Sequence, residues 1–262
     1  AAPLRDLSLS NQNLDAGDAV LIAAGLSATR VLETLQLDGN RLAGFGGGEV
    51  GGVNKLASSL QSMPSLVELN LLLNNFRPIA ALAFQEMWRA NRGITTLCGI
   101  KYEHAAMAMR GMTLVAGDGV LLALDLERNA RLTVLDVSHN RLQYDGVTAL
   151  VDALSSNSTL TSLSLCDNSI IVGCGYKAMK AENGKAGEDS EEEGSYGDSS
   201  ESDDDDASTT SMIGDSDEEL CPGSVMAAAV VQLCAVNSTL THLNLSGNGI
   251  ARDLSNRDVA KL

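Results

Sequence analysis

One pattern of leucines recurs along most of this chain and constrains its fold more than any other feature. The template Leu-x-x-Leu-x-Leu-x-x-Asn-x-Leu is met in full at residues 32–42, and it returns with apolar replacements at 66–76, 132–142, 160–170 and 240–250. Two weaker copies and a fragment lie at 4–14, 104–114 and 94–100. Self-similarity of this kind is the signature of an architecture built by stacking equivalent units.

The chemistry of the template predicts its structure. In Leu-x-Leu, alternate side chains of a short strand point to opposite faces, so both leucines face a core. Strands stacked in parallel would bury these leucines and pair each backbone with the next. The asparagine after each strand is expected to bond turn groups of its own repeat and of the neighbouring one. Gln12 and Met112 stand at this position in the weaker copies and should break the row.

The stretches between the strands have one apolar face and are predicted to be helices. Residues 20–26, 120–126 and 147–154 are examples. The acids near the expected helix starts, where they suit the helix dipole, are Asp15, Asp18, Asp118 and Asp145. The asparagines just past the expected helix ends, where they suit a left-handed cap, are Asn129, Asn157 and Asn237.

A strand followed by a full helix recurs about every 28 residues. This unit resembles the ribonuclease-inhibitor-like leucine-rich repeat, which is also found in NOD-like receptors, Ran GTPase activators and tropomodulins. The resemblance implies an α/β fold, a curved solenoid with parallel strands inside and helices outside. It covers nearly the whole chain outside one acidic segment, and it is specific for fold but weak for function.

The array is predicted to consist of two blocks, because a shift of 100 residues keeps the repeat in register, as with Asn40 and Asn140. Ile94 and His104 both begin strands with no room for a helix between them. A break in curvature is therefore expected around 99–103. The expected divisions are a first block, a second block, a disordered acidic insert and the continuation of the second block, at 1–103, 104–170, 171–222 and 223–262.

The formal net charge of −16 is concentrated in one segment. Residues 182–219 hold sixteen acids and one base, Lys185, and the rest of the chain is close to neutral. Such a segment buries too little apolar surface to offset its ordering entropy, so it is predicted to be disordered. We interpret it as a solubilising spacer or, alternatively, as a polyanionic arm for basic proteins. The serines with an acid three residues on, as acidophilic kinases favour, are Ser190, Ser195, Ser200, Ser202 and Ser216.

No catalytic, cofactor or metal site is predicted. The histidines His104, His139 and His242 are scattered, with no acid or nucleophile at a repeated offset, and the five cysteines have unrelated spacings. The glycine-rich run at 44–52 lacks the Lys-Ser/Thr pair of a phosphate loop.

Composition also bounds the partners and the location of the chain. A nearly neutral body argues against nucleic-acid binding, which needs a basic surface, and no apolar run is long enough to span a membrane. The odd number of cysteines and the lack of a signal peptide predict a reducing compartment, the cytoplasm, with the nucleus as the alternative.

The concave side of the predicted solenoid is the expected binding surface. His139 and His242 are both assigned to strand positions on it, and its candidate binding residues are Asp38, Glu68, Asn70, Arg110, Asp136, Ser138, Ser164, His242 and Asn244. We therefore expect a non-catalytic scaffold for an unidentified protein partner. The alternative implied by the resemblance is a regulator of a small GTPase. The last repeat is incomplete, so other domains of a longer chain are expected.

Overall fold

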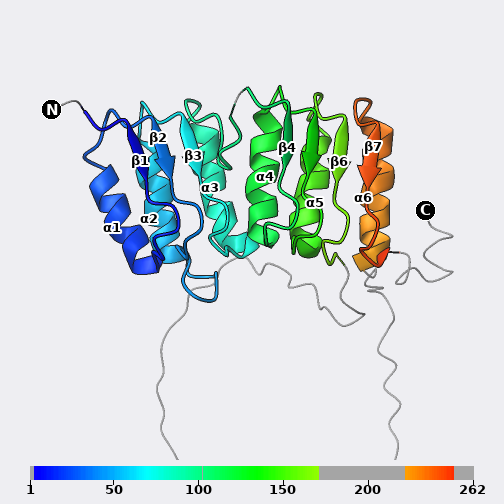
Figure 1. Cartoon of the computed structure of the whole chain (residues 1–262), viewed down its shortest axis with the longest axis horizontal. Coiled ribbons are helices and arrows are strands. Elements are labelled where there is room, and N and C mark those ends of the chain that lie inside the picture. The colour runs from blue at the N-terminus through cyan, green and yellow to red at the C-terminus, as the bar shows by residue number, and fades with distance from the viewer. Residues whose placement is uncertain (1–2, 102, 171–221, 251–262) are drawn as a thin grey trace, which may run out of the picture. The chain divides into compact units, whose positions relative to one another are not determined.

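The computed structural model describes residues 3–101, 103–170 and 222–250, all of which belong to one compact unit. Within it, seven three-residue strands alternate with six helices (Figure 1). The strands are β1 (Asp6–Ser8), β2 (Thr34–Gln36), β3 (Glu68–Asn70), β4 (Ala106–Ala108), β5 (Val134–Asp136), β6 (Ser162–Ser164) and β7 (His242–Asn244). The helices are α1 (Ala16–Leu26), α2 (Val50–Gln61), α3 (Pro78–Ala90), α4 (Ala116–Arg128), α5 (Gln143–Leu154) and α6 (Pro222–Val236). None of these helices is long and apolar enough to cross a membrane.

All strand pairs are parallel and join equivalent positions of successive repeats. The first three strands form one sheet, in which Leu7, Leu35 and Leu69 are in register, and β4 to β7 form a second sheet. Each helix packs against the helix of the next repeat, so the strands make one layer and the helices the other (Figure 1). The predicted α/β solenoid of parallel strands and covering helices is confirmed.

The template leucines form the core between the two layers. Four of them in one copy are at most 1% exposed: Leu32, Leu35, Leu37 and Leu42. Trp88 and Phe84 of α3 are the largest helix side chains in this core, and both are fully buried. Burying one leucine side chain contributes about 1.5–3 kcal/mol, so many similar contributions hold the stack together.

Three of the four acids predicted at helix starts bond the first turns of their helices, and the fourth lies in the first turn. Asp15 is the N-cap of α1, and its carboxylate accepts hydrogen bonds from two backbone N–H groups of the first turn. Asp18 completes a capping box by accepting from the backbone N–H of Asp15. Asp118 accepts in the same way from the N-cap of α4, and Asp145 lies in the first turn of α5. These positions suit the unpaired N–H groups and the positive end of a helix dipole.

The asparagines after the strands form the predicted row, here called the turn row. Asn140 donates to the carbonyl oxygens of Val137, in its own repeat, and of Met109, in the preceding repeat, both at 2.8 Å. Its Oδ1 accepts from the backbone N–H of Leu114 at 3.0 Å. The same bridges are made by Asn40, Asn74, Asn168 and Asn248. At Gln12, by contrast, the side-chain amide donates within its own repeat.

The asparagines after the helices form a second row, and their predicted left-handed caps are wrong. Asn129 has φ −74° and ψ 112°, which is extended backbone, and neither Asn157 nor Asn237 has a positive φ. Asn157 shows the physical reason, because it donates to the carbonyl of Leu126 at 2.8 Å and accepts from the N–H of Leu160 at 2.8 Å. The side chain of Asn157 therefore joins the C-terminal end of α4 to the repeat that follows. This bridge does not need a left-handed backbone.

The strand ladder is interrupted at the junction between α3 and β4, here called the seam (residues 91–105). Thr96 and Cys98 make only isolated bridges to β3, and β3 and β4 are not paired. No described residue of the seam is helical, so α3 packs directly against α4, where Arg128 stacks over the Trp88 ring at 4.1 Å. The interruption includes the residues 99–103, while the predicted break in curvature there and the division into blocks at residue 103 stay predictions.

Two buried carboxylates of α4 bond the backbone before it, one at the seam and one in the turn after β3. Asp125 accepts from the backbone N–H of Leu97 at 2.6 Å and from the hydroxyl of Thr96 at 2.7 Å. Asp118, besides capping its helix, accepts from the backbone N–H of Leu73 at 2.8 Å. Burial raises the pKa of both carboxyl groups from the ordinary 3.8 to about 6, because the loss of water outweighs these hydrogen bonds, which lower it.

The acidic insert predicted at 171–222 lies outside the described residues, apart from Pro222, which begins α6. The five phosphorylation candidates fall in the same undescribed range: Ser190, Ser195, Ser200, Ser202 and Ser216. The continuation predicted at 223–262 is described as far as residue 250.

Candidate binding surface

The outward side chains of the seven strands make up a candidate surface in two parts, over β1 to β3 and over β4 to β7, here called the strand face. The central residue of each strand points to the core, while the first and third residues are exposed or half-buried. The residues of the strand face are Asp6, Ser8, Thr34, Gln36, Glu68, Asn70, Ala106, Ala108, Val134, Asp136, Ser162, Ser164, His242 and Asn244. Alternation along short strands, with one face covered by helices, places them there.

The structure places most of the predicted binding residues at this surface. Six lie on the strands themselves: Glu68, Asn70, Asp136, Ser164, His242 and Asn244. Asp38 and Arg110 follow β2 and β4 in the turns and are half-buried and exposed. The prediction that Ser138 binds a partner is wrong, because its side chain is 0% exposed and cannot reach one.

Ser138 instead connects two charged candidates. Its hydroxyl accepts a hydrogen bond from Nη1 of Arg110 at 3.2 Å, and its backbone N–H donates to Oδ1 of Asp136 at 2.9 Å. Partial burial would raise the pKa of Asp136, but the two hydrogen bonds from Ser138, together with Arg110 and His139, hold it below its ordinary value. Asp136 is thus a persistent anion on β5, with its guanidinium partner one repeat away.

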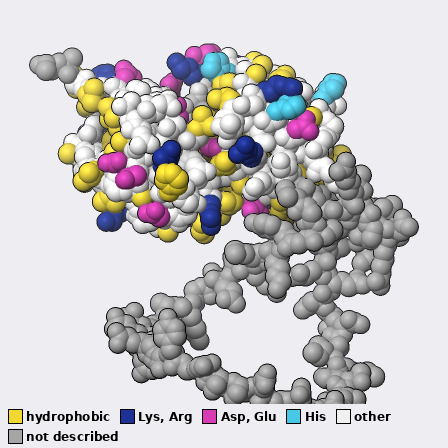
Figure 2. Space-filling model, turned by 60° about the horizontal axis from the view of Figure 1, so that its bottom comes forward, with side chains coloured by type: hydrophobic (Ala, Val, Ile, Leu, Met, Phe, Trp, Pro, Cys, Tyr) yellow, Lys and Arg dark blue, Asp and Glu magenta, His cyan; other side chains and the backbone are white. Residues whose placement is uncertain are grey.

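The strand face carries more negative than positive charge. Among the described residues, five carboxylates lie on it or at its edge, at Asp6, Asp38, Glu68, Asp136 and Asp167, against the guanidinium of Arg110. Among these acids, Asp38 accepts from the hydroxyl of Ser10 at 2.6 Å. Figure 2 shows basic and acidic side chains interspersed over the visible part of the described residues. On the strand face itself, the acids outnumber the bases.

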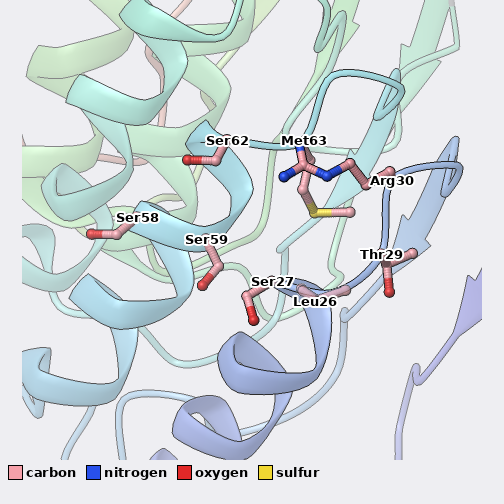
Figure 3. A pocket seen from close by; sticks show the side chains of 8 residues that line it. All are labelled: Leu26, Ser27, Thr29, Arg30, Ser58, Ser59, Ser62 and Met63. Carbon is pink, nitrogen blue, oxygen red and sulfur yellow. The ribbon is translucent and has the colours of Figure 1, made fainter.

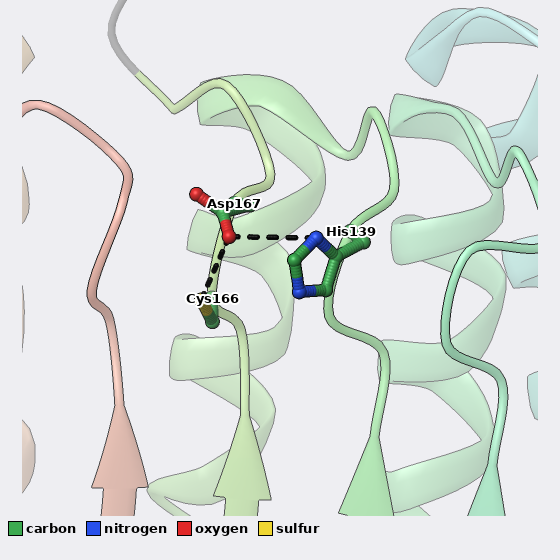
Figure 4. Close-up of side chains that lie close together, drawn as sticks. All are labelled: His139, Cys166 and Asp167. Carbon is green, nitrogen blue, oxygen red and sulfur yellow. Dashed lines mark hydrogen bonds and ion pairs between the residues drawn. The ribbon is translucent and has the colours of Figure 1, made fainter.

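One cluster was missed by the sequence analysis. His139 does not lie on a strand but in the turn after β5, with a φ of 56°, so its predicted strand position is wrong. Its Nδ1 lies 3.4 Å from Oδ2 of Asp167, which also accepts from Sγ of Cys166 at 3.0 Å (Figure 4). The signal was the repeat period, since His139 and Asp167 are 28 residues apart and occupy equivalent turns.

A shallow cavity of about 280 Å³ lies between the C-terminal ends of α1 and α2 (Figure 3). Its lining is rich in hydroxyls, but those of Ser27, Ser58 and Ser59 donate to helix carbonyl oxygens at 2.6, 2.9 and 2.9 Å. Arg30 supplies the one charged side chain of the lining. The hydroxyls are therefore used in closing the helix ends, and we assign no ligand to this cavity.

The glycine-rich run at 44–52 is explained by close packing. Gly47 has a φ of 70°, and its carbonyl accepts from the backbone N–H of Arg77 in the next repeat at 2.8 Å. A Cβ at Gly52, in the first turn of α2, would lie 2.4 Å from the carbonyl oxygen of Ala16 at the start of α1. These glycines let two helix starts and a turn approach one another.

Comparisons with known proteins found a family model and solved structures to which parts of this chain are similar. A family model described as "Leucine Rich repeat" matches residues 128–151 and 236–251. A comparison with curated protein sequences found no match. Among solved structures, the chain matches one titled "Leiomodin-1 Actin-Binding Site 2 (ABS2)" at 16% identity and a TM-score of 0.33, covering 78% of this chain and 88% of that one.

Proposed function

We propose that this array of leucine-rich repeats is a non-catalytic scaffold whose strand face binds a basic segment of a protein partner. Stacked repeats present extended surfaces on which protein partners lie across several units. The observation that carries the proposal is the set of carboxylates that successive repeats hold on one face, at Asp6, Asp38 and Glu68.

The register of the first sheet gives this set its spacing. Asp6 pairs with Thr34, and Thr34 pairs with Glu68, so the two acids are two strands apart. Neighbouring strands lie about 4.8 Å apart, which puts the backbones of Asp6 and Glu68 roughly 10 Å from each other. Lysine or arginine side chains on an extended segment lying across the strands would meet both carboxylates.

The composition of the strand face also bounds the affinity. The described strand positions hold no tryptophan, tyrosine or phenylalanine, which are among the residues that dominate tight interfaces. Half-exposed carboxylates act mainly through long-range attraction, which speeds association and selects charge. We therefore propose a salt-sensitive interaction of moderate strength.

A charge-reversal pair tests the proposal. Asp6→Lys with Glu68→Lys changes two strand-face acids without touching the core, whereas Glu86→Lys with Asp152→Lys changes two exposed acids of α3 and α5. Quantitative affinity capture compares the proteins that each variant recovers. The proposal is supported if a protein is recovered by the unaltered chain and by the variant of α3 and α5, but not by the variant of Asp6 and Glu68. Equal recovery by both variants would contradict it.

The alternative, regulation of a small GTPase, has a separate test. GTP turnover by a panel of small GTPases is measured with and without the chain. The scaffold proposal predicts an unchanged rate of GTP hydrolysis. A rate that rises in proportion to the added chain would contradict it and support regulation of a small GTPase.

We also propose that the acidic residues of 182–219 form a second binding element for basic proteins, strengthened by phosphorylation. Its support is the sequence, where each of the five candidate serines has an acid three residues on. Each phosphate would add about −1.5 to −2 charges. Treatment with casein kinase 2, followed by mass spectrometry and titration with histones, tests both parts. Histone binding that is unchanged by phosphorylation would contradict the proposed strengthening.

The cytoplasmic location stays a prediction.

A further inference from the structure

Three side chains with different donor atoms meet at the edge of the strand face. His139 comes from the turn after β5, and Cys166 and Asp167 come from the turn after β6 (Figure 4). Their nitrogen, sulfur and oxygen atoms all lie within 4.8 Å of one another. We propose that these residues bind a divalent transition-metal ion of the zinc class through Nδ1, Sγ and a carboxylate oxygen.

The distances suit such an ion. Donor atoms around a tetrahedral zinc ion, with bonds of about 2.0–2.3 Å, lie about 3.3–3.8 Å apart. The His139–Asp167 separation is 3.4 Å, the Cys166–Asp167 separation is 3.0 Å, and all three donor atoms lie within 4.8 Å of one another. Small rotations of the exposed histidine and of the two half-buried side chains would bring the three donors around one centre and leave a fourth position for water or for a partner's side chain.

The backbone holds the donors in place across three repeats. The N–H of His139 donates to the carbonyl of Cys166 at 2.8 Å, and the N–H of Asp167 donates to the carbonyl of Ser246 at 3.0 Å. The other carboxylate oxygen of Asp167 lies against Gly247, where a Cβ would come within 1.8 Å of it. The carboxylate thus occupies space that only glycine leaves free, and it points back toward the histidine and the thiol.

The conformations of the two turns are also costly for these residues. His139 and Asp167 have φ values of 56° and 53° at a position where every copy of the turn has a positive φ, with glycine at 39, 111 and 247 and with Asn11 and Leu73 in the other two copies. A positive φ outside glycine costs free energy. The left-handed turn is thus a property of the repeat, and it directs the side chains of these two residues to the same edge of neighbouring repeats.

The chemistry favours a metal over a catalytic cysteine. A nucleophilic cysteine needs a base or a cation aimed at its sulfur, but the Cys166 thiol donates to Oδ2 of Asp167, the same oxygen that faces Nδ1 of His139, and no hydrogen bond joins the thiol to the histidine. A metal ion suits this arrangement because it displaces the thiol proton and is shared by all three donors. Mixed nitrogen and sulfur donors select zinc, cobalt or nickel over magnesium and calcium, which prefer oxygen.

Cobalt(II) titration of the full, reduced chain tests the site, because thiolate ligation gives cobalt a charge-transfer absorption that carboxylates alone do not. We expect one equivalent to produce this band and zinc to displace it. Cys166→Ser should abolish the band, and His139→Ala and Asp167→Asn should each weaken binding about tenfold or more. The matched controls Cys234→Ser, Cys174→Ser and His242→Ala should bind as the unaltered chain does.

Three results would overturn the proposal: no band, a band that survives Cys166→Ser, or unchanged affinity in His139→Ala and Asp167→Asn. A second measurement avoids variants and so does not depend on their folding. Zinc should slow the alkylation of Cys166 in the unaltered chain, followed by mass spectrometry, and should leave the exposed Cys234 unprotected. Equal alkylation of Cys166 with and without zinc would also exclude the site.

Discussion

A single asparagine of the turn row satisfies three backbone groups, so its removal should be costly. Asn140→Ala leaves the carbonyl oxygens of Met109 and Val137 and the N–H of Leu114 without that partner in a buried site. Each buried polar group left unsatisfied costs about 1–3 kcal/mol. We expect the free energy of unfolding, measured with urea, to fall by about 3–5 kcal/mol. Asn244→Ala, at an exposed strand position, is the control and should cost less than about 1 kcal/mol; equal losses would contradict the role of the row.

A single carboxyl group at the seam should make stability depend on pH. The pKa of Asp125 is raised in the folded chain from 3.8 to about 6, so its stabilising contribution is complete below about pH 4 and is lost as the pH rises through 6. The loss amounts to about 3 kcal/mol at 1.4 kcal/mol per pKa unit. Asp125→Asn stays neutral, so its destabilisation relative to the unaltered chain should shrink between pH 4 and pH 7.5. Urea denaturation across this range measures it, and a constant difference would refute the shift.

Single residues also show what the sequence could and could not predict. The turn row was predictable because asparagine recurs at one template position beside buried leucines. The second row was misjudged because an asparagine after a helix suits both a left-handed cap and a bridge to the next repeat, and only the stacked neighbour decides between them. His139 and Asp167 were missed because local spacing was considered, whereas the stack brings together residues one period apart.

At the scale of the helices, glycine sets how closely α4 approaches the repeat before it. A Cβ at Gly117 would lie 2.2 Å from the carbonyl oxygen of Phe76. Gly117→Ala must therefore push α4 away, and overpacking of this kind costs about 1–3 kcal/mol. Gly25→Ala in α1 is the matched control, because its Cβ would meet nothing within 4 Å, and it should stabilise the chain by about 0.5–1 kcal/mol. Thermal unfolding measures both, and shifts of the same sign would contradict the packing argument.

The elements themselves were predictable because strand and helix have different periods and the pattern repeats. All seven strands lie at the template copies, and the fragment at 94–100 forms no strand of its own. The bonds that the buried carboxylates of α4 make to the preceding backbone were not predictable from local pattern. Asp118 and Asp125 bond backbone groups 45 and 28 residues away, and nothing near either residue in sequence marks it as buried.

At the scale of the whole molecule, each repeat contacts only its neighbours, so the fold should tolerate change wherever the stack is kept. Deleting residues 171–222 tests this, because Ile170 would then lead directly into Gly223. Gly223 corresponds to Gln143, the first residue of α5, so the deletion restores the spacing from Asn140 to Leu160 between Asn168 and Leu240. All strands and the described leucine core stay in place.

We expect the deleted chain to unfold at the same temperature as the full chain or slightly above it. Closing a shorter connection favours the folded state by about 1–2 kcal/mol, which corresponds to a rise of a few degrees. The deletion removes sixteen acids and three bases and changes the net charge from −16 to −3, so the comparison is made in salt high enough to screen charge. A midpoint lower by several degrees would mean that the segment packs on the repeats, because only lost contacts can outweigh the entropy gained by shortening the connection.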